Sequence, residues 1–379
     1  MSFPGYTLRL PRDIRFGRGV AKDAVPDIAA LGARLFLVQG GSSRGDWLVE
    51  ALKAEGAEVE TIQATGEPDL AGLEAAVAQA RAFGPDAVVS YGGGAVVDLG
   101  KAVAGLVREL QPAQDYLEVV GTGQKLTTDP VPFVAIPTTA GTGAEVTKNA
   151  VIGVPSHRRK VSLRDDRMLA RMAIVDPSLT DGTPWEVTRN SGLDACVQVI
   201  EPYLCSRANP VTDAICAQAI PVGLKAVATL AEGEDPDARD ELANVSLMGG
   251  VALANAGLGA VHGLAGPLGG VTPAPHGAIC GRLLPAVLSA NGSAIPADTE
   301  VAKRIDQVNQ WIATAFGVSG PEALATWLDD RGLPRLSAMG LADVDIPDVA
   351  EAALGSSSMK ANPVQLTAGD LDQVLRASF

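Results

Sequence analysis

The feature that most restricts the fold is an alternation of short apolar runs with longer amphipathic stretches over roughly the first half of the chain. The expected elements are strands at residues 35–39, 59–62, 86–91 and 133–136, and helices at residues 46–55 and 70–83. This order of strand, turn, helix and strand requires crossover connections, which make neighbouring strands parallel and place helices over the sheet. We therefore expect an α/β domain with a largely parallel, doubly wound sheet.

The pattern changes at segment 176–185, which contains two prolines and a glycine. Beyond it, apolar residues recur every three or four positions, as between Leu193 and Leu204, and this is the periodicity of a helix. A chain of 379 residues is long enough for two domains, and its 47% hydrophobic content supports large cores. We predict an α/β dinucleotide-binding domain at residues 1–183 and an all-helical metal and substrate domain at residues 184–379.

The charge balance and the cysteines restrict the partners and the compartment. With 44 acidic residues against 30 lysines and arginines, the net charge is −14, which repels a phosphate backbone or an anionic membrane. No run approaches the roughly 18 to 20 apolar residues of a membrane helix, and the N-terminus does not have the pattern of a signal peptide. The four cysteines lack C-x-x-C spacing, which favours reduced, buried thiols. We expect a cytoplasmic protein without nucleic-acid or membrane partners.

A glycine-rich turn follows the expected strand 86–91 and opens a helix. Gly92, Gly93 and Gly94 allow positive φ values and close approach of a ligand. The free N–H groups and the positive dipole end of the following helix attract a pyrophosphate. An ordinary strand-to-helix turn is also glycine-rich, and the sequence is not G-x-G-x-x-G, so this loop alone leaves both interpretations open.

A threonine-rich loop, residues 137–147, follows the next strand. Its hydroxyl groups, at Thr138, Thr139, Thr142 and Thr147, suit hydrogen bonding to phosphate and ribose oxygens. A solvated loop is the alternative. Because open α/β sheets bind ligands at the carboxyl ends of their strands, two such loops on neighbouring strands favour a dinucleotide site.

Together these motifs resemble those of the iron-containing (group III) alcohol dehydrogenases, which have a dehydroquinate synthase-like fold. Gly92-Gly93-Gly94-x-x-x-Asp98-x-x-Lys101 matches the pyrophosphate loop of that family, with Ala95 where serine is common. The loop 137–147 matches its second cofactor loop. The resemblance implies an NAD(P)-dependent oxidoreductase that interconverts an alcohol and an aldehyde or ketone by hydride transfer, assisted by a divalent metal. It also implies a small-molecule substrate and a homodimer.

The resemblance assigns the cofactor-binding residues and bears on the choice of cofactor. The expected set is Gly40, Ser42, Ser43, Gly92, Gly93, Gly94, Ala95, Asp98, Thr138, Thr139, Thr142, Thr147, Lys160 and Leu179. Relatives that choose NAD often carry an aspartate near position 40 that bonds the adenosine ribose, whereas here no carboxylate occurs before Asp46. Ser42, Ser43 and Arg44 can instead bond a 2′-phosphate, so we expect NADP(H) to be accepted. The other basic residues between 157 and 171 are expected at the surface.

The resemblance also places a metal site in the helical domain. Relatives hold the ion with an aspartate, a histidine four residues later and two further histidines. Asp194, His262 and His276 match, and Gln198 occupies the remaining position, one helical turn from Asp194. Two imidazoles and a carboxylate suit Fe²⁺ or Zn²⁺, whereas glutamine is a weaker ligand. We expect Asp194, His262 and His276 to be catalytic and, with Gln198, to bind the metal; the alternative is a pocket that has lost its ion.

Further departures keep other functions open. Gly266 stands where many relatives carry a proton-relaying histidine, so the proton must pass through water and the cofactor ribose, or the pocket is enlarged for a bulkier substrate. Glu201 is either a partner of a metal ligand or a surface charge. The altered metal site also resembles maleylacetate reductase-like enzymes with weak or no metal dependence. A dehydroquinate synthase-like lyase is disfavoured because the chain has only three histidines, and a binding protein without activity is the last alternative.

Overall fold

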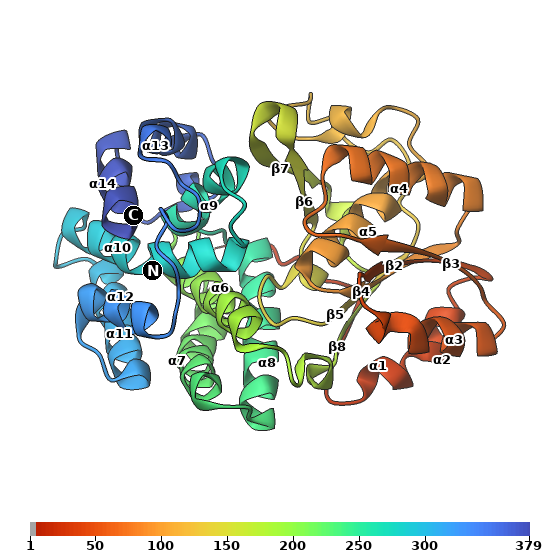
Figure 1. Ribbon diagram of the computed structural model, residues 1–379, viewed down its shortest axis with the longest axis horizontal. Coiled ribbons are helices and arrows are strands. Elements are labelled where there is room, and N and C mark those ends of the chain that lie inside the picture. The colour runs from red at the N-terminus through yellow and green to blue at the C-terminus, as the bar shows by residue number, and fades with distance from the viewer. Residues whose placement is uncertain (1–4) are drawn as a thin grey trace. The chain divides into compact units, whose positions relative to one another are not determined.

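The computed structural model describes residues 5–379, which form two compact units (Figure 1). The α/β unit contains residues 9–139 and 143–181. The helical unit contains residues 182–379 together with the short segments 5–8 and 140–142.

The α/β unit is built on one main sheet. In the described residues this sheet has six strands in the order β1-β8-β5-β4-β2-β3. Their bounds are β1 (Asp13–Phe16), β2 (Arg34–Gly40), β3 (Glu58–Ala64), β4 (Ala87–Gly92), β5 (Phe133–Pro137) and β8 (Met172–Val175). All neighbouring pairs are parallel. The predicted parallel α/β domain is therefore confirmed.

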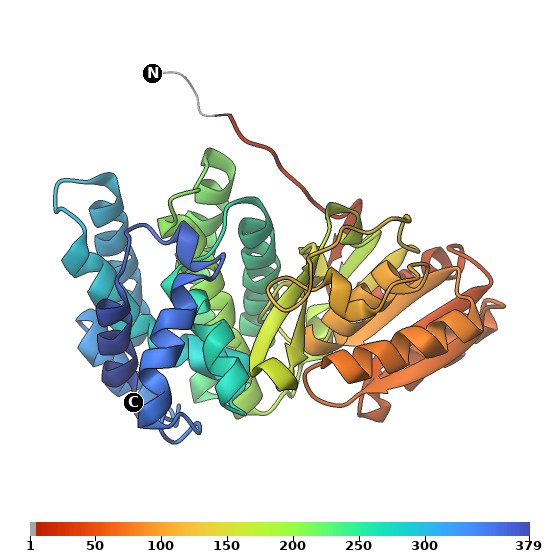
Figure 2. The ribbon, with the colours of Figure 1, turned by 90° about the horizontal axis from the view of Figure 1, so that it is seen from above.

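Helices cover both faces of this sheet because its central strands, β2, β4 and β5, are apolar on both sides. Phe36 and Val38 of β2 belong to one buried cluster, and Leu35 and Leu37 belong to another, since successive side chains point to opposite faces. The first cluster packs under α4 (Leu70–Phe83) and α5 (Gly94–Leu106), and the second packs under α1 (Val20–Asp23), α2 (Val25–Ala29) and α3 (Asp46–Ala54). Figures 1 and 2 show these helices lying on the sheet. The predicted doubly wound arrangement is therefore confirmed.

An antiparallel hairpin lies beside the main sheet and was not anticipated from the sequence. Its strands are β6 (Asn149–Val154) and β7 (Arg159–Arg164), which pair over their whole length. The connecting turn places Arg158 at a φ of 48°, in the left-handed region. Strand β6 packs against α5, so the hairpin supports the helix that begins at the glycine loop.

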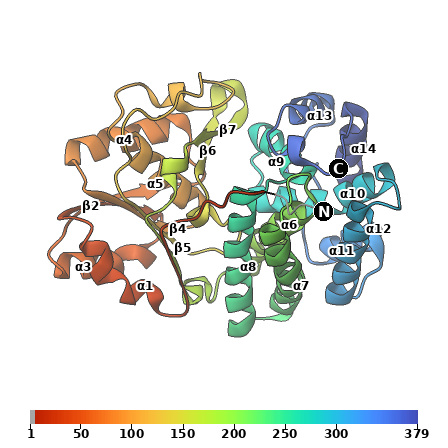
Figure 3. The ribbon, with the colours of Figure 1, turned by 180° about the vertical axis from the view of Figure 1, so that it is seen from behind.

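The second unit is helical, as predicted. Its helices are α6 (Trp185–Leu204), α7 (Pro210–Glu232), α8 (Pro236–Asn255), α9 (Ala260–Val271), α10 (His276–Ala294), α11 (Glu300–Phe316), α12 (Gly320–Asp330), α13 (Ile346–Leu354) and α14 (Ala368–Ser378). Helix α6 packs against α7, α8 and α10. Figure 3 shows α6, α7 and α8 side by side. The nearly all-round burial of α6 explains why its charged and amide side chains require specific partners.

Short 3-10 turns complete the description. They are η1 (Ser43–Gly45), η2 (Ala113–Tyr116), η3 (Ala144–Val146), η4 (Pro155–His157), η5 (Asp166–Met168), η6 (Pro177–Thr180), η7 (Asp343–Asp345) and η8 (Met359–Ala361). Two of them, η1 and η3, follow the carboxyl ends of β2 and β5, where the sequence predicted cofactor contacts.

One helix in the described part of the chain, α7, is long and apolar enough to cross a membrane by length and composition. Helices α8 and α9 pass the same test only as a pair bent by 96°. The expectation that no segment approaches a membrane span in apolar length was therefore too strict. Helix α7 packs against α6 and α8, and its residues Cys216, Ile220 and Leu224 are buried there. Its apolar character thus fits a core helix of the bundle.

Candidate functional site

The carboxyl edge of the sheet collects three of the loops that the sequence singled out. Tyr91 of β4 pairs with Gln39 of β2, and Gly92 pairs with Pro137 of β5, so the three strands end at the same level. After β2 the chain moves outward to β3 and then returns to β4 on the other side of β2. Ligands of open α/β sheets bind outside such a reversal point. The edge formed by β2, β4 and β5 therefore has the topology of a nucleotide site.

The glycines of this loop do not have the backbone conformation that the sequence predicted. None of Gly92, Gly93 and Gly94 has a positive φ, so the expectation of left-handed backbone was wrong. A Cβ at Gly92 would lie 2.6 Å from the Val96 side chain, and one at Gly100 would lie 1.9 Å from Ser90 Oγ. Glycine is thus required for the close approach of α5 to β4. Gly93 caps α5, and Ala95 lies in its first turn, where helical N–H groups lack intrahelical partners and can bind an anion.

The first half of the threonine loop touches the glycine loop. The backbone N–H of Thr138 donates to the Gly92 carbonyl at 3.0 Å, and a Cβ at Gly93 would lie 3.3 Å from Thr139 Oγ1. Gly40 ends β2, while Ser42 and Ser43 begin the exposed turn η1 at the same edge. Seven of the predicted cofactor residues thus lie at one edge of the sheet.

Thr147 has a structural role in the second half of the threonine loop. Its Oγ1 accepts a hydrogen bond from Lys101 Nζ at 2.9 Å and donates one to the Ala144 carbonyl at 3.1 Å. Its hydroxyl therefore points into the loop. Thr142 belongs to the helical unit, where its carbonyl accepts a hydrogen bond from Gln198.

The ammonium group of Lys101 holds this loop together. It is fully buried and donates to the carbonyls of Ala144 and Asn149 at 2.7 and 2.8 Å, besides Thr147. Burial lowers its pKa, against the opposing charges of Asp98 and Glu145. Burial also raises the pKa of the Glu145 carboxyl to about 7. The lysine of the Gly-Gly-Gly-x-x-x-Asp-x-x-Lys motif thus ties α5 to the end of the threonine loop.

Three further predicted cofactor residues have protein partners of their own. Asp98 accepts a hydrogen bond from the Val151 N–H at 3.0 Å, and Lys160 pairs with the Glu67 carboxylate. The Leu179 carbonyl accepts a hydrogen bond from the Arg44 guanidinium at 3.0 Å. The contacts of Asp98, Lys160 and Leu179 with a cofactor stay predictions.

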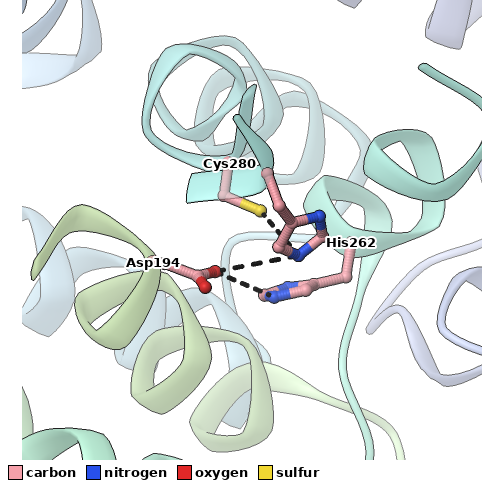
Figure 4. Close-up of side chains that lie close together, drawn as sticks. Asp194, His262 and Cys280 are labelled. Atoms are coloured by element: carbon pink, nitrogen blue, oxygen red, sulfur yellow. Dashed lines mark hydrogen bonds and ion pairs between the residues drawn. The ribbon is translucent and has the colours of Figure 1, made fainter. Parts of the chain in front are cut away.

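The helical unit brings four metal-ligating side chains together. Asp194 comes from α6, His262 from α9, and His276 and Cys280 from α10, and one ligand atom of each lies within 4.8 Å of all the others. Asp194 Oδ1 is 3.4 Å from His262 Nε2 and 3.9 Å from His276 Nε2. Figure 4 shows Asp194, His262 and Cys280 converging. The three residues predicted to be catalytic are thus neighbours, although a metal-binding role for them stays a prediction.

The electrostatics of this cluster fit a bound cation. Asp194 Oδ1 and His262 Nε2 are buried and lack hydrogen-bond partners within the described residues, which is costly unless another group satisfies them. Burial alone would lower the histidine pKa values, but the charges of Cys280 and Asp194 outweigh it. The pKa of His262 is raised well above 6.5 and that of His276 to about 9. Burial opposes ionisation of Asp194, yet the two histidines lower its pKa. The negative charge gathered around these two imidazoles suits a divalent ion.

Glu201 orients one of the predicted ligands. Its carboxylate accepts hydrogen bonds from His262 Nδ1 at 2.6 Å and from the Val261 N–H at 2.7 Å. Holding Nδ1 turns Nε2 toward Asp194, and this is how carboxylates fix metal-ligating histidines. A Cβ at Gly259 would lie 2.8 Å from Glu201 Oε1, so the start of α9 must be a glycine. Of the two roles that the sequence allowed Glu201, the structure supports the partner of a ligand.

The two departures from the family pattern can now be placed. Gln198 is buried and donates from Nε2 to the Thr142 carbonyl at 2.6 Å; its role as a metal ligand stays a prediction. A Cβ at Gly266 would meet nothing within 4 Å, so the space of the absent histidine stays open. Sequence reasoning missed Cys280, although its position four residues after His276 on one helix face was an available signal.

The remaining cysteines and the third histidine lie outside this cluster. All four cysteines are free and buried, as expected. His157 is exposed and contacts Ser156 in η4.

Comparison with known proteins identifies the family. The family model for iron-containing alcohol dehydrogenase matches residues 11–177, and the model for the C-terminal part of the Fe-containing alcohol dehydrogenase family matches residues 188–379. The chain therefore belongs to the iron-containing alcohol dehydrogenase family, which uses NAD(H) and a metal. The predicted resemblance, and with it the oxidoreductase class, is confirmed.

Individual relatives agree over most of the chain. The long-chain-alcohol dehydrogenase 1 of Geobacillus thermodenitrificans is 31% identical over 374 residues, covering 96% of this chain and 94% of the relative. The 1,3-propanediol dehydrogenase of Citrobacter freundii is 32% identical, covering 78% and 76%. Among solved structures, a 1,3-propanediol oxidoreductase superposes with a TM-score of 0.86 at 27% identity, covering 99% of this chain and 100% of that one. An iron-containing alcohol dehydrogenase from Thermotoga maritima also gives 0.86, at 26% identity and 99% coverage of both.

Proposed function

We propose that this chain interconverts an alcohol and an aldehyde or ketone by NAD(P)(H)-dependent hydride transfer, with a divalent ion in its helical unit. The observation that carries the proposal is the convergence of Asp194, His262 and His276, with two buried ligand atoms that make no hydrogen bond in the described residues. When bound, the dinucleotide supplies or accepts the hydride and the ion polarises the substrate oxygen. Fe²⁺ and Zn²⁺ are the ions that this donor set suits.

The chain itself contributes binding and orientation. The first turn of α5 and the hydroxyl groups of Thr138 and Thr139 are suited to hold the pyrophosphate at the sheet edge. Glu201 keeps His262 Nε2 directed at the ion position. Because position 266 carries no histidine, we assign proton transfer to water and the cofactor ribose hydroxyl rather than to a side chain.

We propose that NADP(H) is accepted alongside NAD(H). The support is the segment after β2, where Ser42, Ser43 and Arg44 are exposed. No carboxylate lies between the end of β2 at Gly40 and Asp46. The bond to the Leu179 carbonyl restrains the Arg44 guanidinium, a group suited to a phosphate. Arg44→Ala should lower kcat/KM for NADPH roughly tenfold, as expected for a charged hydrogen bond worth about 1.5 kcal/mol, and leave kcat/KM for NADH unchanged. Equal losses with both cofactors would count against a 2′-phosphate contact.

We propose an alcohol or carbonyl compound with a bulky or extended chain as the substrate. The support is the open space at Gly266, one helical turn from His262 on α9. A relative that acts on long-chain alcohols, by its name, agrees with this choice. A chain-length series of aldehydes should therefore give kcat/KM values that rise with length.

We also propose a homodimer in the cytoplasm. The family resemblance supports the dimer, and the four free buried thiols suit a reducing compartment. Sedimentation of the purified protein and fractionation of producing cells test these two assignments.

The activity is tested with purified protein, NADH and NADPH, and panels of aldehydes and alcohols, with elemental analysis of the same preparation. Oxidation of NAD(P)H in proportion to the bound metal, and its loss in Asp194→Ala, are the expected results. The departure at Gln198 favours one rival, a maleylacetate reductase-like enzyme. Full activity on an unsaturated substrate after complete removal of the metal would establish that rival instead.

A further inference from the structure

We propose that the thiolate of Cys280 is the fourth protein ligand of the metal centre, in the position that relatives fill with the residue aligned to Gln198. This inference rests on the proposed function in so far as that function places a divalent ion between Asp194, His262 and His276. It adds a residue that the family pattern does not contain, and it changes the donor set from nitrogen and oxygen alone to one that includes sulfur.

The known distances between the donor atoms are close to the edges of one tetrahedral shell. With metal–sulfur distances of about 2.3 Å and metal–nitrogen or metal–oxygen distances of about 2.0–2.1 Å, the edges of a tetrahedron are about 3.5 Å from sulfur to nitrogen and about 3.3 Å from nitrogen to oxygen. Cys280 Sγ lies 3.5 Å from His276 Nε2, and His262 Nε2 lies 3.4 Å from Asp194 Oδ1. A third distance, 3.9 Å from Asp194 Oδ1 to His276 Nε2, needs only a small contraction, and the other three pairs of donor atoms lie within 4.8 Å.

Cys280 is placed for this role by its helix. His276 and Cys280 are four residues apart on α10, so both project from the same face toward Asp194 on α6. Helices α6 and α10 pack closely because a Cβ at Gly281 would lie 2.7 Å from Leu193, and one at Gly277 would lie 2.1 Å from the Asn190 carbonyl. The two glycines beside the ligands thus allow the approach that brings sulfur and carboxylate together.

The amide nitrogen of Gln198 is engaged by contacts within the helical unit. Its side chain is only 3% exposed, and its Nε2 donates to the Thr142 carbonyl at 2.6 Å. A Cβ at Gly249 on α8 would lie 3.4 Å from that same nitrogen, so a neighbouring helix also packs against the amide. The amide nitrogen of Gln198 therefore has a structural role, as a link between α6 and segment 140–142, that needs no ion.

The charge balance favours the thiolate as well. One carboxylate and one thiolate neutralise a divalent ion, whereas Asp194 with a neutral glutamine would leave a net charge of +1 in a buried site. Thiolate ligands shift preference toward Zn²⁺ and Co²⁺ and away from Mg²⁺ and Mn²⁺. The His276 side chain is 36% exposed, so one side of the cluster stays open for a substrate.

The test uses cobalt as a spectroscopic probe and needs no substrate. The whole protein is stripped of metal with a chelator, reloaded with Co²⁺, and examined for thiolate-to-cobalt charge transfer in the near ultraviolet. The wild type should show this band with one cobalt per chain, and Cys280→Ser and Cys280→Ala should lack it. Gln198→Ala should keep the band. Cys196→Ala is the matched control, because Cys196 is also buried and lies two residues from Asp194, while its sulfur faces Gly223 on α7.

Each outcome decides the proposal. A band that persists in both Cys280 variants, that disappears in Gln198→Ala, or that is absent from the wild type overturns it, as does failure of the wild type to bind cobalt. Circular dichroism of the two Cys280 variants shows that a lost band is not lost folding, and at least one of them must be folded for the comparison. A protein with the band but without turnover of any alcohol or aldehyde would refute the proposed function alone. Turnover without the band would refute only the thiolate ligand.

Discussion

Replacing Glu201 by glutamine should weaken metal binding without removing any ligand. The Glu201 carboxylate accepts from the Val261 N–H through one oxygen and from His262 Nδ1 through the other. Glutamine has a single acceptor oxygen, so one of these donors would face an NH₂ group. An unsatisfied buried donor costs about 1–3 kcal/mol, and loss of a carboxylate behind a metal-bound histidine lowers metal affinity about 10–100-fold. Both estimates agree on a loss of roughly 1.4–2.7 kcal/mol of binding free energy for Glu201→Gln.

The assay is a competition titration of the metal against a chelator of known affinity, combined with urea unfolding of the metal-free protein. Glu186→Gln is the matched control, because Glu186 lies exposed in the first turn of the same helix, α6. The control should bind metal like the wild type. If Glu201→Gln also retained wild-type metal affinity, the inference that Glu201 directs His262 Nε2 toward the ion would be refuted.

Three further changes test the fold, the helix packing and the proton route. Glu109→Gln should destabilise the protein by about 3 kcal/mol at pH 7. The Glu109 carboxylate accepts four hydrogen bonds from Thr127 and Thr128 and one from Tyr116. These bonds hold its pKa at about 2, against the opposing effect of burial. This stabilisation is complete above pH 4.5 and fades as the pH falls toward 2. The free energies of unfolding of the wild type and Glu109→Gln, measured with denaturant, should therefore converge in acid. A difference that does not change with pH would contradict the pKa argument. Gly100→Ala should cost about 1–3 kcal/mol in the same assay, since its Cβ would displace Ser90 Oγ, and wild-type stability would refute the packing argument. Gly266→His fits the open space and should add a histidine ionisation to the pH profile of kcat/KM, whereas an unchanged profile would place that position away from the proton route.

The central strands and the first long helices were predictable from local pattern. Strands β2, β4 and β5 are apolar runs bounded by turn residues. Helix α4 has the predicted bounds because Asp69 caps its start and Gly84 ends it in the left-handed region. The edge strand β1 and its neighbour β8 are four residues each, which is too short a pattern to be recognised. The hairpin of β6 and β7 was missed because it interrupts a series of crossover units with a local antiparallel pair.

The site was only partly predictable because its members come from distant parts of the chain. Asp194, His262 and His276 could be chosen from a resemblance, since their residue types and neighbours in sequence match a family pattern. Cys280 lies outside that pattern. Its spacing of four residues from His276 was visible in the sequence, but its closeness to Asp194 follows from the packing of α6 against α10. The grouping of segment 140–142 with the helical unit, rather than with the rest of the threonine loop, likewise follows from tertiary contacts.

The most direct test of metal-assisted hydride transfer follows NAD(P)H oxidation by an aldehyde in one preparation before chelation, after chelation and after return of Zn²⁺ or Fe²⁺. The metal content is measured at each stage. Activity that disappears with the ion and returns in proportion to the ion bound is the predicted result. Undiminished reduction of the aldehyde by metal-free protein would contradict the role given to Asp194, His262 and His276.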